Sequence, residues 1–269
     1  MILASAPVST SAASLMLTLL AALAYAWPAL RGKNMQANVV RIWVIAAWIV
    51  HALALFWSVA GDQPRFCFAT ALSMTAWLVA AVYGVESQIF PQLQTRWTLC
   101  ALGTAAVLLA YFFPGPPLPP SSSAWMPLHL ALGVASYGLF GTAVVHAWIM
   151  SVAESRIRLA EDPHSGLPLL TLERLTYRFV TAGFVCLSAT LLMGILFSET
   201  VYGRALRWDH KTVFSVLSWL TFATLLIGRV RFGWRGKRAV RVLYIGSVFL
   251  LLAYVGSRFV LEVILGRAA

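Results

Sequence analysis

The sequence predicts an all-α, polytopic membrane protein: a bundle of eight transmembrane helices with both termini outside the cytoplasm. Three observations lead to this prediction. Of the 269 residues, 60% are hydrophobic and only 11% are charged, whereas a soluble domain carries about 25% charged residues. Eight apolar runs are long enough to cross a bilayer, which takes about 20 residues each. Lysine and arginine concentrate in alternate loops between these runs.

The eight runs are expected to form a single membrane domain over residues 1–269. They cover residues 12–30, 39–60, 66–85, 97–113, 126–152, 177–198, 213–229 and 239–265. The first run is interpreted as a span and not as a signal peptide, because no lysine or arginine precedes it. The seventh run is the weakest of the eight candidates.

The basic residues orient the chain. Fourteen of them lie near the loops that join spans 1–2, 3–4, 5–6 and 7–8, and six lie on the opposite side. The positive-inside rule places the richer side in the cytoplasm. The pI of about 10.2 therefore reflects topology, and nucleic acid is excluded as a partner because no soluble basic face can be assembled from the remaining residues.

Motifs for bond-making chemistry are absent from the sequence. Cys67, Cys100 and Cys186 each stand alone in apolar stretches, without a C-x-x-C or C-x-x-C-H pattern, and they are expected to be small buried side chains. The sequence contains no P-loop, nucleophile elbow or dinucleotide fingerprint. We therefore expect a binding protein and not an enzyme.

Two histidines lie inside the predicted spans. His51 falls about 15 Å deep in the second span, at about 1.5 Å per residue. It is either a functional ionisable group or a neutral imidazole bonded to a neighbouring helix. His146 lies 17 residues after His129, or about 25 Å along the fifth span, and is expected to be a solvated residue at the cytoplasmic end of that helix. His164 is expected to lie on the surface.

His129 lies just inside the outer end of the fifth span. Trp125 precedes it by four residues and shares its helix face if the helix has begun there. The positions that follow are small, namely Ala131, Gly133, Ala135, Ser136, Gly138 and Gly141. Small residues allow either a neighbouring helix or a flat ligand to approach closely. The alternative for His129 is a helix-end residue that faces headgroups or water.

The stretch from Trp208 to Lys211 precedes the seventh span on the outer side. Asp209 is expected to cap this helix through its backbone N–H groups. That role leaves His210 unexplained. A second outer imidazole opposite His129 would explain it, because two facing imidazoles can ligate a haem iron from both sides.

Arg258 lies about one turn inside the outer end of the last span. It either pairs with Glu262, four residues later, or receives a carboxylate such as a haem propionate. A zinc site is the weaker metal interpretation, because the outer histidines and acidic residues are scattered and lack zinc-ligand spacing.

Several segments resemble the cytochrome c assembly superfamily, which includes CcsA, CcmC and HemX-type proteins. They are the tryptophan–histidine start of the fifth span, the W-D-x-K start of the seventh and the basic turn FGWRGKRA. The segment 234–260 and the stretch WIVHALAL are similar to the YpjD-like inner-membrane branch. The resemblance covers roughly residue 51 to the C-terminus.

The resemblance implies that outer histidines and a tryptophan-rich segment hold haem at the outer surface, with a deeper site inside the spans. By position, His129 matches the first outer histidine, Trp208 and Asp209 match the end of the tryptophan-rich segment, and His51 matches a transmembrane histidine. The chain departs from the family pattern in two places. The tryptophan-rich segment is shortened to LRWDHK, and Arg258 and Glu262 stand where a second outer histidine is usual.

We therefore expect a haem-binding or haem-handling protein of the bacterial inner membrane, accessory or regulatory in cytochrome c biogenesis or tetrapyrrole homeostasis. The expected iron ligands are His129 and His210, with His51 as a further candidate. Trp125 and Trp208 would flank the porphyrin, and Lys211 or Arg258 would meet a propionate. The alternative is a non-haem accessory subunit that packs against another membrane protein, such as a transporter.

Overall fold

The structure is a computed structural model that describes residues 12–31, 34–60, 64–89, 96–117, 125–159, 168–197 and 209–265. Over these residues the regular elements are helices, joined by short segments and one isolated β-bridge between Arg65 and Pro117. The predicted all-α, polytopic class is confirmed.

Each predicted apolar run coincides with a helix over most of its length. The helices are α1 (Ala12–Arg31), α2 (Ala37–Ala60), α3 (Phe68–Ile89), α4 (Arg96–Phe112), α5 (Trp125–Arg158), α6 (Leu169–Leu196), α8 (His210–Phe232) and α9 (Gly236–Leu251). The last span continues through η2 (Leu252–Gly256), α10 (Ser257–Phe259) and η3 (Val260–Ile264), of which η2 and η3 are π-helical.

Seven helices in the described part of the chain are long and apolar enough to cross a membrane. Helix α4, with 17 residues, is the short one. The seventh run, the weakest by sequence, belongs to α8, which has 23 residues. The expectation that the seventh run is the weakest span candidate was therefore wrong. The reason is that α8 begins at a capped residue before the apolar run and continues through Arg229 and Arg231.

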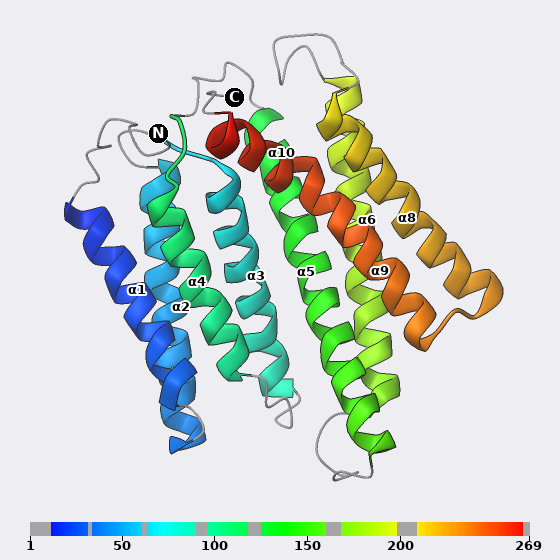
Figure 1. Cartoon of the computed structure of the whole chain (residues 1–269), viewed down its shortest axis with the longest axis horizontal. Coiled ribbons are helices and arrows are strands. Elements are labelled where there is room, and N and C mark those ends of the chain that lie inside the picture. Colours follow the sequence, from blue (N-terminus) through cyan, green and yellow to red (C-terminus); the bar gives the residue numbers. More distant parts are fainter. Residues whose placement is uncertain are drawn as a thin grey trace.

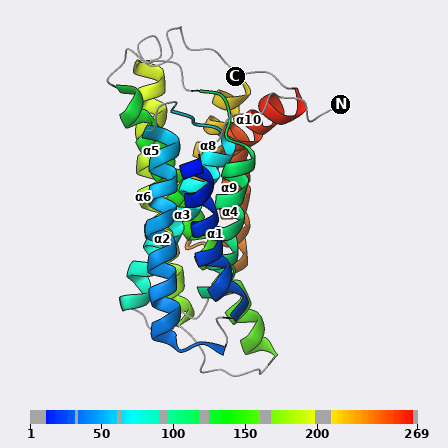
Figure 2. The same ribbon diagram turned by 90° about the vertical axis from the view of Figure 1, so that its left-hand side faces the viewer.

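The chain folds into two groups of helices that meet at α3 and α5 (Figure 1). Helices α1 to α4 form one group, and α5 to α10 form the other. Helix α1 begins and η3 ends at the same end of the bundle (Figure 1). We call this end the outer end, following the predicted orientation, and the opposite end the inner end; Figure 2 shows the bundle from the side of α1 and α2.

Glycines on α5 allow α3 to approach closely. A Cβ atom on Gly138 would lie 2.7 Å from the Leu78 side chain, and one on Gly141 would lie 3.0 Å from Val79. Contacts this short show that the two helices touch at these positions. The small face of α5 here receives a neighbouring helix, which was one of its two predicted uses.

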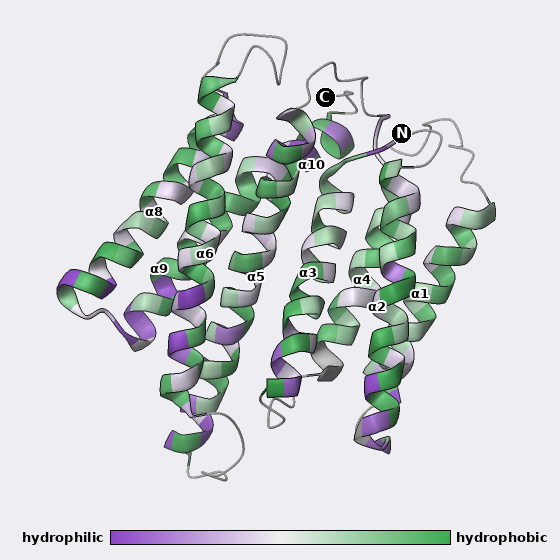
Figure 3. Cartoon of the chain, turned by 180° about the vertical axis from the view of Figure 1, so that it is seen from behind, coloured by the Kyte–Doolittle hydropathy of each residue, from purple (hydrophilic) through white to green (hydrophobic). Residues whose placement is uncertain are grey.

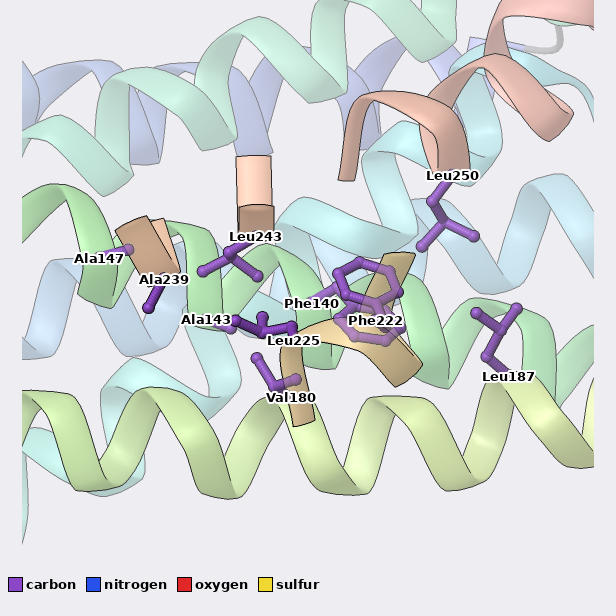
Figure 4. Close-up of a cluster of buried hydrophobic side chains, with 10 residues drawn as sticks. All are labelled: Phe140, Ala143, Ala147, Val180, Leu187, Phe222, Leu225, Ala239, Leu243 and Leu250. Carbon is purple, nitrogen blue, oxygen red and sulfur yellow. The ribbon is translucent and has the colours of Figure 1, made fainter. Parts of the chain in front are cut away.

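The largest buried cluster lies among α5, α6, α8 and α9 (Figure 4). At its centre the rings of Phe140 and Phe222 stack with centroids 3.7 Å apart. Large apolar side chains also face outward, as at Leu30 (83% exposed) and Val230 (82%). Hydrophobic residues make up most of each helix, and hydrophilic ones gather toward the helix ends (Figure 3). Such a surface suits lipid and would be unfavourable in water.

Candidate functional site

His129 lies in the second turn of α5, against the outer end of α6. A Cβ atom on Gly194 of α6 would lie 3.8 Å from the imidazole Cε1 of His129. The side chain is partly exposed, and it interacts electrostatically with Lys211 of α8. The imidazole is therefore positioned by α5, next to a position of α6 without a side chain and near a cation of α8.

Trp125 forms an aromatic pair one turn before His129. Its ring stacks on Phe197, with centroids 5.1 Å apart and planes 14° apart. Because Trp125 begins α5 and Phe197 caps the end of α6, the pair joins the outer ends of the two helices. Trp125 is 46% exposed. Trp208, predicted as its counterpart, lies outside the described residues.

Lys211 and Arg258 both lie near the ring of Tyr254. The Lys211 Nζ atom and the Arg258 guanidinium carbon are each 5.6 Å from the ring centroid. Lys211 belongs to α8, Tyr254 to η2 and Arg258 to α10, so the fold brings residues more than 40 positions apart to one place. Together with His129, these residues form what we call the outer cluster.

Arg258 also forms the predicted local ion pair. Its Nη1 lies 3.4 Å from Glu262 Oε1, and both side chains are largely buried. The Arg258 Nε is buried and has no hydrogen-bond partner in the described part of the chain. The ion pair therefore satisfies only part of the guanidinium, and a buried donor remains for another acceptor.

The outer cluster lies where the last span leaves α-helical geometry. Tyr254 is in the π-helical η2, Glu262 is in the π-helical η3, and Arg258 lies between them. A π-helical turn holds an extra residue and changes the direction of the side chains that follow, and such turns occur frequently at functional sites. The irregular stretch is confined to the part of the span that carries these polar residues.

Asp209 caps α8 as predicted. Its Oδ1 accepts hydrogen bonds from the Thr212 backbone N–H at 2.9 Å and from the Thr212 hydroxyl at 3.1 Å. Partial burial by itself raises the pKa of Asp209. The Thr212 hydrogen bonds, with smaller contributions from Lys211 and His210, outweigh burial and bring the pKa below its ordinary value.

His210 has an exposed side chain at the first position of α8. Successive helical residues are rotated by about 100°, so His210 and Lys211 project from different faces. Because Lys211 faces Tyr254, the described contacts bring Lys211, and not His210, toward His129. The role of His210 as a second iron ligand stays a prediction.

His51 is buried among α1, α2 and α3, in the other group of helices. Its Nδ1 lies 3.4 Å from the Tyr25 hydroxyl and its Nε2 lies 2.8 Å from the Ser73 hydroxyl. Both ring nitrogens thus have polar neighbours on adjacent helices, as expected for the second of its two predicted roles. The structure does not join His51 to the outer cluster.

The prediction for His146 was wrong. This residue is 1% exposed, and its Nε2 lies 2.8 Å from Oε2 of Glu86, which is also buried. The error arose because the fifth span was ended at residue 152, whereas α5 continues to Arg158. Glu86 was missed because the third span was ended at residue 85. Its position directly after an apolar run was the signal that could have marked it as a partner for a histidine in another span.

Comparison with known proteins agrees with these observations. Residues 16–265 match the Cytochrome C assembly protein family. The cytochrome c biogenesis protein CcsA of Prochlorococcus marinus is 23% identical over 263 residues, covering 85% of this chain and 83% of the relative. An uncharacterized 28.8 kDa protein of Azospirillum brasilense is 30% identical over 220 residues, covering 79% and 75%.

The inner membrane protein YpjD of Escherichia coli is 32% identical over 143 residues, which is 52% of this chain and 53% of that protein. The predicted resemblance to the superfamily and to its YpjD-like branch is thus confirmed, as is the prediction of a multi-pass protein of the bacterial inner membrane. On its motifs and over nearly its whole length, the chain belongs to the cytochrome c assembly protein family.

Proposed function

We propose that the chain binds haem non-covalently at the outer cluster, in an accessory or regulatory role in cytochrome c biogenesis or tetrapyrrole homeostasis. Family membership supports haem handling. The observation that carries the proposal is the convergence of His129, Lys211 and Arg258 from three separate helices at one end of the bundle. Binding and positioning need no bond-making step on a substrate.

The chemistry of the outer cluster fits haem. A histidine nitrogen is a common axial ligand of haem iron. Lysine and arginine bind the propionate carboxylates through charge-assisted hydrogen bonds. The buried Nε of Arg258 is a donor that a propionate oxygen would satisfy, and leaving such a donor unsatisfied costs about 1–3 kcal/mol. When bound, the haem supplies the redox-active iron.

Each residue has a distinct role in this proposal. His129 holds the iron, while Lys211 and Arg258 orient the propionates. The aromatic pair of Trp125 and Phe197 borders the macrocycle. His210, exposed and turned to another face of α8, is the lesser candidate for a second axial ligand.

Fewer of the described contacts support the alternative of a non-haem subunit. That alternative requires helix faces of small residues that are free to dock against another membrane protein. Gly138 and Gly141 of α5 are already covered by α3 of the same chain. The haem proposal therefore accounts for more of the described contacts.

Absorption spectroscopy tests the proposal. The protein is purified in detergent, and the Soret region is recorded before and after haemin is added. We expect a band that His129→Ala removes or strongly weakens. His210→Ala should have a smaller effect, and His164→Ala, in the loop predicted to be cytoplasmic, should have none. A band that survives His129→Ala unchanged, or no band at all with added haemin, would contradict the proposal.

A further inference from the structure

A cavity of about 400 Å³ lies between the inner halves of α2 and α3, away from the outer cluster. Its walls include Ile45 and Trp48 of α2, Ala81 and Gly84 of α3, and Cys100 of α4. The lining is almost wholly apolar. This volume is within the range of ligand-binding pockets, about 300–1,000 Å³.

On the outer side of the cavity, α2 and α3 are joined by contacts between their side chains. The rings of Trp48 and Trp77 stack with centroids 4.7 Å apart, and each indole N–H donates to the backbone carbonyl of the other residue. The hydrogen bond between His51 and Ser73 lies further toward the outer end. Trp48 and Trp77 therefore join α2 to α3 through ring stacking and two hydrogen bonds.

Below that junction, α3 presents small residues to the gap. Ala80, Ala81 and Gly84 all line the cavity, and a Cβ atom on Gly84 would meet no atom within 4 Å. Glycine inside a helix is less favourable than alanine by about 1 kcal/mol. Gly84 therefore lies where no described contact requires a glycine, beside a space large enough for a ligand.

Hydrocarbon is the occupant that suits this lining. A water molecule needs two to four polar partners. The Ser87 hydroxyl and the Gln88 amide, at the inner edge of the cavity, both donate to the carbonyl of Gly84. An empty space would lose the dispersion contacts of its walls. Because the lining residues Ile45 and Val85 are exposed on the apolar outer surface of the helices, an acyl chain can enter from the side.

A cation marks the inner edge of the same cavity. Arg41 lines it, is exposed, and has no ion-pair partner among the described residues. It precedes Trp48 by seven residues, two helical turns or about 10 Å, so the two side chains lie on one face of α2. The cavity thus has a positive group at the membrane boundary and an apolar body that extends toward the middle of the bundle.

We infer that this cavity binds one acyl chain of an anionic phospholipid, with its phosphate at Arg41. A positive charge at the headgroup level attracts anionic lipid, and the apolar walls up to Trp48 accept the chain. The bound lipid fills the gap between the inner halves of α2 and α3.

Native mass spectrometry of the full-length protein tests this inference. The protein is reconstituted in vesicles of equal parts phosphatidylglycerol and phosphatidylcholine and then released into detergent. We expect one retained phosphatidylglycerol in preference to phosphatidylcholine. Gly84→Leu, whose side chain would occupy the cavity, should lower this retention by at least about fivefold. Ala46→Leu places the same leucine side chain at an exposed position of α2 outside the lining and should leave the retention unchanged.

The charge is tested separately. Arg41→Gln should remove the preference for phosphatidylglycerol, whereas Arg241→Gln, which removes an exposed arginine from α9, should preserve it. Ala81→Leu replaces Gly84→Leu if the latter does not fold, as judged by helical content. The inference is overturned if the cavity-filling variants retain as much phosphatidylglycerol as the unaltered protein does. It is also overturned if the unaltered protein retains both lipids equally, or if it holds an isoprenoid quinone in place of phospholipid.

Discussion

The two histidines of α5 lie in opposite surroundings, although 17 residues of one helix separate them. His146 is buried against the Glu86 carboxylate, and the ring of Phe179 packs against it with centroids 5.3 Å apart. His129 is partly exposed and lies near the Lys211 cation, in a cluster that also contains Arg258. The comparison separates a histidine that joins helices from one that the proposed function assigns to a ligand.

The difference follows from the charge of each partner. The imidazole of His146 and the buried carboxylate of Glu86 form a pair that links α3 to α5, while Nδ1 of His146 and Oε1 of Glu86 have no hydrogen-bond partner among the described residues. An imidazole among cations has neighbours that attract an anion from outside the protein. The sequence predicted a solvated His146 at the helix end, because the acidic partner on α3 could not be recognised from the apolar run of α5 alone.

The largest expected effect comes from breaking the buried pair of Glu86 and His146. Glu86→Ala leaves the imidazole of His146 buried without its partner, which should lower the free energy of unfolding by about 3–5 kcal/mol. Denaturation in mixed detergent micelles would measure this change. Glu154→Ala removes the exposed i,i+4 partner of Arg158 and should cost no more than about 0.5 kcal/mol. Similar values for the two variants would show that the buried pair is not a structural link.

A second test targets the contact between Gly138 of α5 and Leu78 of α3, the helices that bear His146 and Glu86. Gly138→Val would push a branched side chain into Leu78, since even a Cβ atom would lie 2.7 Å from it. Overpacking of this kind costs about 1–3 kcal/mol. Gly84→Ala on α3 has open space and should be neutral or stabilising. If Gly138→Val unfolds no more readily than Gly84→Ala, then α3 and α5 do not pack as described.

A third test concerns the cations near His129 and rests on the proposed function. Arg258→Gln and Lys211→Gln should each weaken haemin binding by roughly tenfold, or about 1.4 kcal/mol, because each removes a partner for a propionate. Spectroscopic titration with haemin and with its dimethyl ester, which has no free carboxylates, would measure this. The ester should bind the variants and the unaltered protein alike. An equal loss for both ligands would mean that the cations do not bind propionates.

The smallest effect is expected at the start of α8. Asp209→Ala should cost about 1 kcal/mol, because the cap on Thr212 is lost. The folded-state pKa of Asp209 is below its ordinary value, so its contribution is complete above the unfolded pKa of about 3.9 and is lost as pH falls through the folded pKa. Unfolding curves between pH 6 and acid conditions, about pH 3, would show this slope. Asp209→Asn should keep most of the cap but lose the pH dependence of the free energy of unfolding. If that pH dependence persists in the variant, Asp209 is not its source.

Several helix ends could not be predicted from the apolar runs. Helix α6 begins at Leu169, eight residues before its predicted start at Tyr177, and contains Glu173. That carboxylate accepts a hydrogen bond from Arg229 of α8 at 2.5 Å. Charge normally signals the end of a membrane span, but a charge paired with another helix does not. The pairing is a long-range contact that hydropathy along one segment cannot reveal.

Composition and motifs by themselves determined the all-α, membrane-spanning class, the positions of the apolar runs, the Asp209 cap and the family. These properties depend on the transfer of side chains into lipid and on local backbone hydrogen bonds, which neighbouring residues control. Only the tertiary structure decided that His146 is bound to Glu86, that Lys211 and Arg258 share the ring of Tyr254, and that a cavity remains beside Gly84. Those outcomes depend on which helices become neighbours and on how each is rotated, and residues far apart in the sequence determine both.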